Sequence, residues 1–149
     1  MKDLRQFYIN GQWVNPVQAN DLHVENPANQ EMVATISMGA AADVEMAVAA
    51  AKAAFPVYSN FSVDERIALM EKLLQIYMDR YDEMAAVISM EMGAPISFAS
   101  AAQADTGRGH ISTALEALKV FEFERQVLNT RIIKEPIGVC GFITPWNWP

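Results

Sequence analysis

Residues that bind metals or cross-link secreted proteins are scarce in this sequence. Cys140 is the only cysteine among 149 residues, and the histidines are limited to His23 and His110. A single thiol excludes an internal disulfide, and three scattered Cys and His residues make a poor ligand set for zinc. We therefore expect no metal site, and we do not expect the disulfide framework of a small secreted domain.

Long hydrophobic runs and clusters of basic residues are also absent. No stretch of about 18 uninterrupted apolar residues is present, so we expect no membrane span, and the N-terminus lacks the apolar core of a signal peptide. The chain has 11 Lys and Arg against 18 Asp and Glu, a net charge of −7. This balance argues against nucleic acid or an anionic membrane as a partner. The composition predicts a soluble, cytoplasmic protein.

The residues that are present favour a folded domain. Hydrophobic residues make up 52% of the chain and charged residues 19%, which excludes disorder caused by low hydrophobicity and high charge. Residues 1–91 hold 13 acidic and 6 basic residues, whereas residues 92–149 hold five of each. An acidic excess of this kind is typical of solvated helix faces, and the neutral C-terminal part resembles a protein interior.

The N-terminal part reads as β-structure. Residues 7–9 and 13–14 flank Asn10-Gly11, a pair that tolerates the positive φ angles of a tight hairpin turn. Val24 and residues 32–36 are further strand candidates, and they are separated by a turn cluster at residues 26–29.

Helical patterns follow in the middle of the chain. An alanine-rich segment, residues 40–54, has apolar residues at helical spacing. Ser62 and Glu65 fit a capping box at the start of a second helical region, which continues with a bend to Met92, where Gly93 and then a proline end it. Residues 97–124 read as helical again.

Two glycines interrupt that last helical pattern. Gly107 and Gly109 lie in the stretch 105–110, which superficially resembles a phosphate-binding loop. No strand precedes the stretch, a third glycine is missing and no Gly-Lys-Ser/Thr follows, so close packing or a local bend is the better interpretation.

The last part of the chain changes its pattern. Residues 127–135 partly alternate and favour an exposed strand, which Pro136 interrupts. Residues 137–144 form a nearly continuous apolar run, typical of a parallel strand covered on both faces, in which Cys140 would be a small core residue. A buried parallel strand needs neighbours and a crossover helix, and none follows here. On these grounds we expect the front part of a larger α/β protein.

Asn147 follows directly after that predicted strand. Ligands of open α/β sheets bind beyond the carboxyl ends of the strands. The asparagine amide is an uncharged donor that can stabilise a developing oxyanion. From its spacing alone, however, an asparagine in a proline-flanked turn is more often structural.

The C-terminal motif resembles a known family. Glu135-Pro136-Ile137-Gly138-Val139, running into Thr144-Pro145-Trp146-Asn147-Trp148-Pro149, closely resembles the signature of the aldehyde dehydrogenase superfamily. Further blocks match upstream in family order: Ile9-Asn10-Gly11-Gln12-Trp13, Asn26-Pro27-Ala28, Asp43-Val44, Ala47 to Ala51, Glu65-Arg66 and Glu91-Met92-Gly93-Ala94-Pro95. The resemblance spans essentially the whole chain, which would correspond to the first third of a family member.

The resemblance implies a fold and its division. The chain is expected to be the N-terminal part of an aldehyde dehydrogenase-like α/β fold with an N-terminal β-hairpin. Residues 1–125 and 137–149 would form an incomplete Rossmann-like domain that binds NAD or NADP. Residues 126–136 would be a strand of the oligomerisation arm of a homodimer or homotetramer, and the catalytic domain would be absent.

The resemblance also implies an activity, the oxidation of an aldehyde to a carboxylic acid through a cysteine thioester. Asn147 would be the oxyanion-stabilising asparagine, and Trp148 would line the aldehyde tunnel. The segment along the cofactor would be Ile143, Thr144, Pro145 and Trp146. The catalytic cysteine, the general-base glutamate and the glycine-bearing pyrophosphate turn would lie downstream, so we expect these 149 residues alone to be inactive.

Two other interpretations stay open at this point. The chain could be a non-catalytic assembly fragment that pairs in trans through residues 127–136. Alternatively, it could belong to a cofactor-binding relative that has lost its nucleophile. The downstream reading frame would discriminate both from an enzyme, because an enzyme needs a Gly-Gln-x-Cys block preceded by a glutamate block.

Overall fold

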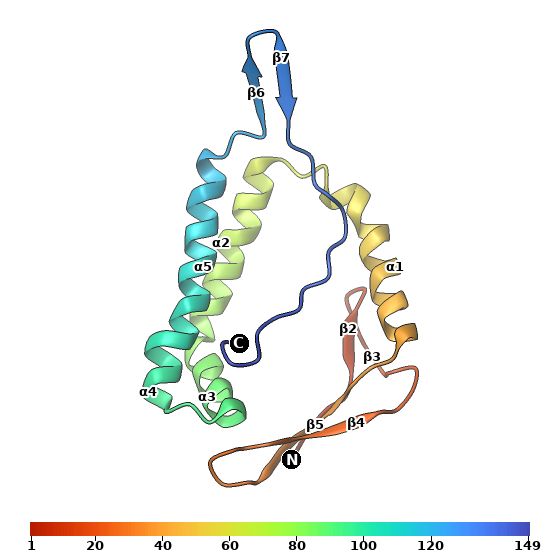
Figure 1. The fold of residues 1–149 in the computed structure, drawn as a ribbon, viewed down its shortest axis with the longest axis vertical. Helices are drawn as coiled ribbons and strands as arrows, with labels where there is room; N and C mark the ends of the chain where they lie inside the picture. Colours follow the sequence, from red (N-terminus) through yellow and green to blue (C-terminus); the bar gives the residue numbers. More distant parts are fainter.

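Strands occupy both ends of the chain and helices occupy its middle, as a computed structural model of residues 1–149 shows (Figure 1). The strands are β1 (Lys2–Leu4), β2 (Phe7–Ile9), β3 (Gln12–Val14), β4 (Asp21–Glu25), β5 (Met32–Ser37), β6 (Glu124–Val127) and β7 (Thr130–Ile133). The helices are α1 (Ala41–Tyr58), α2 (Val63–Asp79), α3 (Tyr81–Met92), α4 (Ile96–Phe98), the π-helix η1 (Ala99–Ala104) and α5 (Asp105–Val120). The fold is mixed α/β, as predicted, and none of these helices combines the length and hydrophobicity needed to span a lipid bilayer.

The N-terminal strands form a hairpin and a small sheet. Strands β2 and β3 pair antiparallel around Asn10 and Gly11, whose φ angles are 53° and 76°. These positive angles are the reason for the Asn-Gly pair, and they confirm the predicted hairpin. The sheet has the order β1-β5-β4, with β1 parallel and β4 antiparallel to β5. Strand β1, which the sequence pattern did not predict, completes one edge.

Helix α1 is fixed to the N-terminal part by a buried carboxylate. The carboxylate of Asp43, 5% exposed, accepts hydrogen bonds from the backbone N–H groups of Ala40 and Val17, both at 2.8 Å. An acid in the first turn satisfies free N–H groups and complements the positive end of the helix. The alanine-rich segment is therefore a helix, as predicted, and it extends to Tyr58.

The signals at the ends of α2 and α3 are confirmed. Glu65 accepts from the Ser62 N–H at 2.7 Å, and the Ser62 hydroxyl accepts from the Glu65 N–H at 3.2 Å. The Ser62 N–H and then its hydroxyl lower the pKa of the Glu65 carboxyl. Arg80, with φ −112° and ψ 15°, produces the predicted bend between the two helices. Gly93 ends α3 at φ 77°, in the left-handed conformation expected of a C-terminal glycine.

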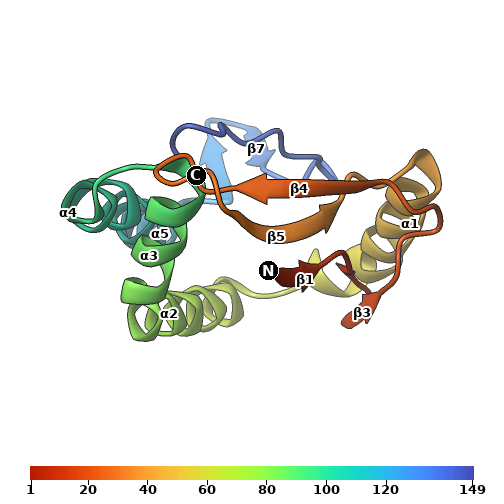
Figure 2. The ribbon, with the colours of Figure 1, turned by 90° about the horizontal axis from the view of Figure 1, so that it is seen from below.

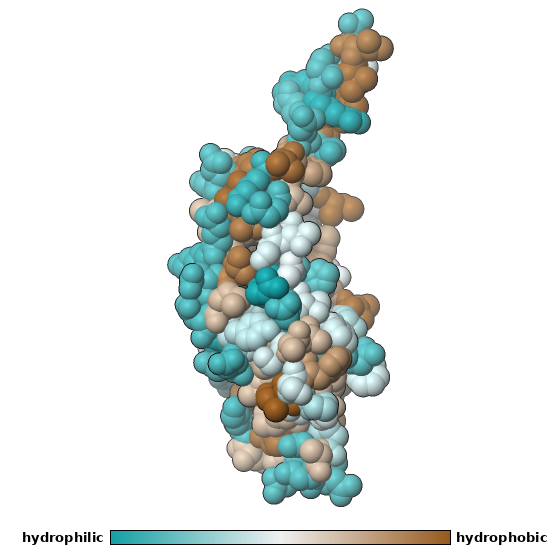
Figure 3. All heavy atoms as spheres, turned by 90° about the vertical axis from the view of Figure 1, so that its left-hand side faces the viewer, coloured by the Kyte–Doolittle hydropathy of each residue, from teal (hydrophilic) through white to brown (hydrophobic).

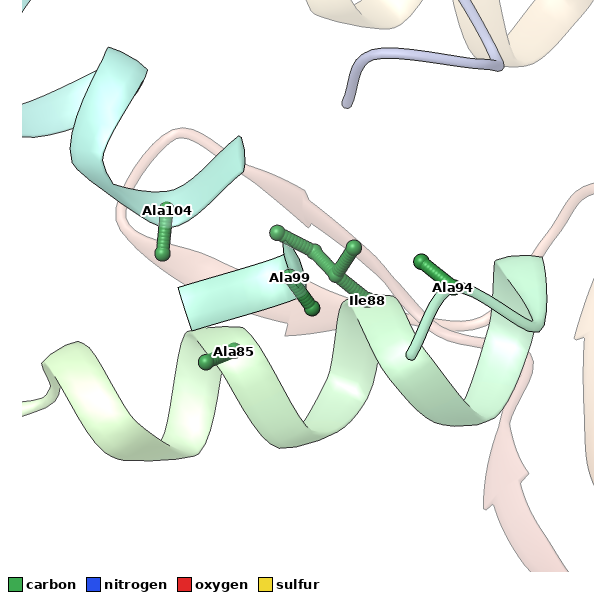
Figure 4. Packing of buried hydrophobic residues seen from close by; sticks show 5 residues of the cluster. All are labelled: Ala85, Ile88, Ala94, Ala99 and Ala104. Carbon is green, nitrogen blue, oxygen red and sulfur yellow. The ribbon is translucent and has the colours of Figure 1, made fainter. Parts of the chain in front are cut away.

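The helices pack through small residues. The core cluster consists of Ala85, Ile88, Ala94, Ala99 and Ala104, and it lies where α3 meets η1 (Figure 4). Four of its five members are alanines, so the backbones of these elements approach closely. α2 and α5 lie side by side, while α1 stands apart from them in both views (Figures 1 and 2).

The third helical region has a finer structure than the sequence predicted. It consists of α4, the π-helix η1 and α5, and it ends at Val120 instead of residue 124 because Phe121 is already extended. Gly107 lies in α5, where an added Cβ would come within 2.4 Å of the Tyr77 hydroxyl. Close packing is therefore the reason for Gly107, as predicted, and residues 105–110 are helical.

The predicted single strand over residues 127–135 is instead a hairpin. Strands β6 and β7 pair antiparallel, and Val127 pairs with Thr130 across a two-residue turn. Turning back lets the segment satisfy its backbone hydrogen bonds within itself, which one isolated strand cannot do. The hairpin projects from the helices and has hydrophobic atoms along one side and hydrophilic atoms along the other (Figure 3).

The prediction of a buried strand over residues 137–144 is wrong for this chain. The residues form no strand, and Ile137, Phe142 and Ile143 are 94%, 88% and 103% exposed. Cys140 is exposed as well, so the prediction that it is a core residue is also wrong. The physical reason is the same for both: no other strand of the chain lies beside the segment to pair with it or cover it.

Exposed surface is unusually large for the mass. The chain exposes 11087 Å², and only 11 of its 149 residues are buried. A compact monomer of 16.5 kDa exposes roughly 7,500 Å². The helices and the C-terminal segment therefore present extensive apolar surface that the chain does not cover itself.

Candidate functional site

The candidate site lies at the end of the segment that follows β7. Lys134, at the start of the segment, is still attached to the residues before β6. Its N–H donates to the Phe123 carbonyl at 2.8 Å, and its ammonium lies 4.1 Å from the Phe121 ring centroid. Beyond Pro136 the segment contains no helix or strand. Figure 1 shows it running from the base of the hairpin to the C-terminus near the middle of the molecule.

Two contacts fix the end of this segment against α4 and η1. The ring of Trp148 meets that of Phe98 edge-to-face, with centroids 5.6 Å apart and an interplanar angle of 84°. The side-chain amide of Gln103 donates from Nε2 to the backbone carbonyl of Asn147 at 3.4 Å. One contact is aromatic and the other polar, and they hold adjacent residues. The motif residues Asn147 and Trp148 therefore have a defined place on the helical part.

Gln103 is the most buried polar residue, with 1% of its surface exposed. Its Nε2 also lies 3.3 Å from the Met92 sulfur, so both neighbours of this nitrogen are acceptors and the orientation of the amide is determined. Its Oε1 is buried and has no hydrogen-bond partner. An unpaired buried acceptor costs about 1–3 kcal/mol of stability, so an apolar side chain would be the better choice for packing alone.

Hydroxyl groups brace the π-helix that carries Gln103. Tyr77 donates to the Ala104 carbonyl at 2.7 Å, Tyr81 to the Ser100 carbonyl at 2.6 Å and Thr106 to the Ala102 carbonyl at 2.8 Å. Burial, followed by the charges of Tyr81 and Asp105, raises the pKa of the Tyr77 phenol, so it stays a protonated donor. These bonds take up carbonyls around the wider turn and fix its position.

The residue after η1 is held by an ion pair. Arg108 makes two hydrogen bonds to Asp105, Nε to Oδ1 at 2.7 Å and a terminal nitrogen to Oδ2 at 3.0 Å. This guanidinium lowers the pKa of the Asp105 carboxyl. The only strongly basic group in the stretch 105–110 is thus already paired within the helix, which leaves no free basic side chain for a phosphate there.

The other predicted site residues are not brought together. Ile143, Thr144, Pro145 and Trp146 are all exposed, and no hydrogen bond from these four residues is present. Asn147 is exposed too, with its side-chain amide free of hydrogen bonds. The sequence interpretation did not find Phe98 or Gln103. A usable signal was present, since Gln103 is the single long polar side chain in the alanine-rich stretch 99–104.

Elsewhere in the molecule, an open cavity of about 550 Å³ lies at the base of the hairpin. Its lining includes Phe61, Arg66 and Phe123, and the Arg66 guanidinium lies 5.5 Å from the Phe123 ring centroid. None of the motif residues 143–149 lines it. No group of three or more His, Cys, Asp or Glu side chains is arranged to hold a metal ion.

Comparison with known proteins assigns the family. A sequence profile described as the aldehyde dehydrogenase family matches residues 13–149, including both the helical part and the C-terminal motif. The chain belongs to the aldehyde dehydrogenase family.

Individual aldehyde dehydrogenases match over the whole chain. A 3-succinoylsemialdehyde-pyridine dehydrogenase from a Pseudomonas species is 45% identical over 100% of this chain. The solved structure of a cysteine-to-alanine variant of aldehyde dehydrogenase C from Pseudomonas syringae, in complex with NAD+ and octanal, is 43% identical, with a TM-score of 0.95 over 97% of this chain. Betaine aldehyde dehydrogenase from Staphylococcus aureus, solved with NAD+, is 26% identical, with a TM-score of 0.89 over 99% of this chain.

The chain spans only part of these aldehyde dehydrogenases. It covers 31% of the Pseudomonas dehydrogenase, 30% of the Pseudomonas syringae structure and 31% of the Staphylococcus aureus structure. The matched part is their N-terminal portion. The resemblance in the sequence is thus confirmed at the level of family and fold.

The chain's own residues fit part of a nicotinamide cofactor. Residues 136–149 contain no charged residue, and Ile143 to Trp146 present exposed, uncharged side chains with unpaired backbone groups. Such a donor set suits the uncharged parts of a dinucleotide. It does not suit the pyrophosphate, which proteins bind with a glycine-rich turn at a helix N-terminus.

Proposed function

We propose that this chain is the N-terminal part of an NAD(P)-dependent enzyme that oxidises an aldehyde to a carboxylic acid. The observation that carries the proposal is the placement of Asn147: its backbone is anchored through Gln103, its neighbour Trp148 packs on Phe98, and its side-chain amide is free. A donor held in this way suits a transition state in which negative charge develops on oxygen.

In the proposed reaction, Asn147 donates a hydrogen bond to the aldehyde oxygen when a thiolate attacks the carbonyl carbon. The amide has no titratable proton, so it stabilises the oxyanion at any working pH. The donor needs no reorganisation if its backbone is already fixed. Trp148, half-exposed beside Phe98, would contact the rest of the aldehyde and limit the width of its tunnel.

The segment before Asn147 would contact the cofactor. We assign Ile143, Thr144, Pro145 and Trp146 to the uncharged part of NAD or NADP, through uncharged side chains and free backbone groups. When bound, the nicotinamide supplies the acceptor for the hydride. Support comes from the exposed, unpaired state of these residues and from relatives that are solved with NAD+.

We place the nucleophile outside these 149 residues. Cys140 is exposed, and its thiol has one hydrogen-bond partner, the Gly138 carbonyl at 3.8 Å, which is neither a base nor a cation. Activated cysteines have a base or a cation as a neighbour. We therefore expect the isolated chain to be inactive. We also propose that residues 126–136, which include most of the β6–β7 hairpin, belong to an oligomerisation arm. The predicted cytoplasmic location stays a prediction.

The test is a comparison of the 149-residue chain with a complete enzyme, in which the coding region is extended to the length of the relatives. Both are purified and assayed for reduction of NAD+ and NADP+ with a panel of aldehydes, from short aliphatic to octanal and aromatic semialdehydes. We expect turnover only in the complete enzyme. The panel also identifies the aldehyde class and the preferred cofactor.

Two results would contradict the proposal. Aldehyde-dependent NAD(P)H formation by the pure 149-residue chain would place the nucleophile within it. A folded complete enzyme that binds NAD+ but oxidises no aldehyde would favour a cofactor-binding relative without catalysis.

A further inference from the structure

The inference concerns Gln103, which lies in the π-helix η1 and is not part of the C-terminal motif. Its side chain is 1% exposed, and its Nε2 donates to the Asn147 carbonyl at 3.4 Å. The two residues are 44 positions apart in the chain, so the contact is a tertiary one. It is the one hydrogen bond between the helical part and residues 144–149.

Packing alone does not explain a glutamine at this position. Its Oε1 is buried without a partner, so the side chain retains the desolvation penalty of an unsatisfied acceptor. Buried polar groups that remain unsatisfied call for a specific explanation. We explain the glutamine by the nitrogen of the same amide group, whose N–H donates to the Asn147 carbonyl.

The support of Gln103 is rigid. The carbonyls of Ser100, Ala102 and Ala104 accept from side-chain hydroxyls around η1, and Ala99 and Ala104 are fully buried in the core cluster. Figure 4 shows Ala99 and Ala104 directed toward α3. A donor on such a support has a fixed position, whereas the segment that it holds is exposed and contains no helix or strand.

We propose that Gln103 is a positioning residue, which holds the Asn147 backbone so that the asparagine amide is directed at the reacting oxygen. The inference rests on the proposed role of Asn147. The edge-to-face contact of Phe98 with Trp148 restrains the next residue from the same side. Gln103 touches neither aldehyde nor cofactor, and it acts only through the orientation of its neighbour.

The decisive experiment is a double-mutant cycle in the complete enzyme. Gln103→Met keeps the unbranched shape and removes both the donor and the orphaned acceptor, so folding should be maintained. We expect kcat to fall roughly 10-fold, less than the 10²–10³-fold expected for loss of the asparagine amide itself. KM for the aldehyde should change by less than about threefold, because the interaction acts on the transition state. In an Asn147→Ala background, Gln103→Met should cause no further loss.

A second readout does not depend on activity. Loss of the Gln103 bond should speed amide hydrogen exchange of Trp146, Asn147 and Trp148, while exchange in α2 stays unchanged. The matched control is Gln75→Met, the same change at an exposed glutamine on α2, which should alter neither exchange nor kcat. Gln103→Leu also removes the donor and the buried acceptor without introducing a charge, so it carries the same test where Gln103→Met folds poorly.

The outcomes separate the two proposals. Asn147→Ala with unchanged kcat overturns the proposed function, and with it the role of Gln103. If Asn147→Ala lowers kcat, two further results overturn only the inference about Gln103. One is a wild-type kcat and wild-type hydrogen exchange in Gln103→Met, and the other is a double variant in which the two losses of kcat multiply.

Discussion

The helical part of the molecule, α2 to α5, and the C-terminal segment, residues 134–149, differ in how they obtain their structure. Helix α2 begins at a capping box, helix α3 ends at a left-handed glycine, and the core cluster is buried. The C-terminal segment has neither strand partners nor cover, yet it carries the motif. The part that carries the chemistry therefore depends on the other part, through two contacts.

Hydrogen bonding explains this difference. A helix pairs its N–H and C=O groups within a few residues, so its structure needs no distant partner. An extended segment pairs only with another strand. In this chain, strands β6 and β7 pair with each other, whereas residues 137–144 have no strand to pair with. The chain alone thus shows fully formed local structure beside an unformed non-local element.

The largest expected effect separates chemistry from stability. Asn147→Ala in the complete enzyme should lower kcat by about 10²–10³, or ~3–4 kcal/mol of transition-state stabilisation, if the amide binds the oxyanion. The melting temperature should change little, because the side chain is exposed and makes no hydrogen bond in the chain. The measurement is kcat at saturating aldehyde and cofactor, with calorimetry on the same samples. A wild-type kcat with chemistry rate-limiting would falsify the assignment.

The opposite result is expected in the core cluster. Ile88, 3% exposed, is its largest member, and Ile88→Ala should cost about 2–3 kcal/mol of stability. The value lies at the low end of the usual range because the other members are small and the helices can approach. Urea unfolding of the complete enzyme measures this loss. The kcat of the folded fraction should stay within about threefold of wild type, and a larger drop would mean that the core and the site are not separable.

The success of the sequence predictions divides along the same boundary. The hairpin at Asn10-Gly11, the capping box of Ser62 and the stop at Gly93 were predicted correctly, because each signal acts over a few residues. The family was also identified correctly from the motif blocks. The predictions for residues 137–144 and Cys140 were wrong for this chain, because no strand of the chain pairs with the apolar segment or covers it.

The candidate site shows the same limit. Asn147 and Trp148 were singled out by the motif, but their contacts, Gln103 and Phe98, come from a part of the chain about 45 residues earlier. No local pattern reports such a pairing. The π-helix could not be predicted from the local sequence either. Its carbonyls accept hydrogen bonds from the hydroxyls of Tyr77 and Tyr81, which lie on other helices.

A pair of glycines in α5 gives effects of opposite sign. Gly107→Ala should destabilise the chain by about 1–3 kcal/mol, because the new Cβ would lie 2.4 Å from the Tyr77 hydroxyl and displace it from the Ala104 carbonyl. Gly109→Ala should stabilise it by about 0.5–1 kcal/mol, since nothing lies within 4 Å and alanine is the better helix former. The measurement is the denaturant midpoint of each variant relative to wild type. Midpoints that shift by the same amount in the same direction would contradict this packing of α5 on α2.

The smallest expected effect on stability is that of a substitution at Cys140. This residue tests directly whether the C-terminal segment lacks the cover that the helical part has. In the 149-residue chain the thiol is exposed, so Cys140→Ala should change stability by less than about 0.5 kcal/mol. A thiol reagent should also label it as fast as it labels the unfolded chain.

In the complete enzyme, residues 137–143 would gain strand partners, and labelling of Cys140 should be at least about 10²-fold slower, because the reagent must wait for local opening. Mass spectrometry of the peptide that contains Cys140 follows this site separately from any downstream cysteine. Slow labelling in the short chain would mean that another copy already covers the segment, whereas fast labelling in the complete enzyme would mean that it never becomes a buried strand.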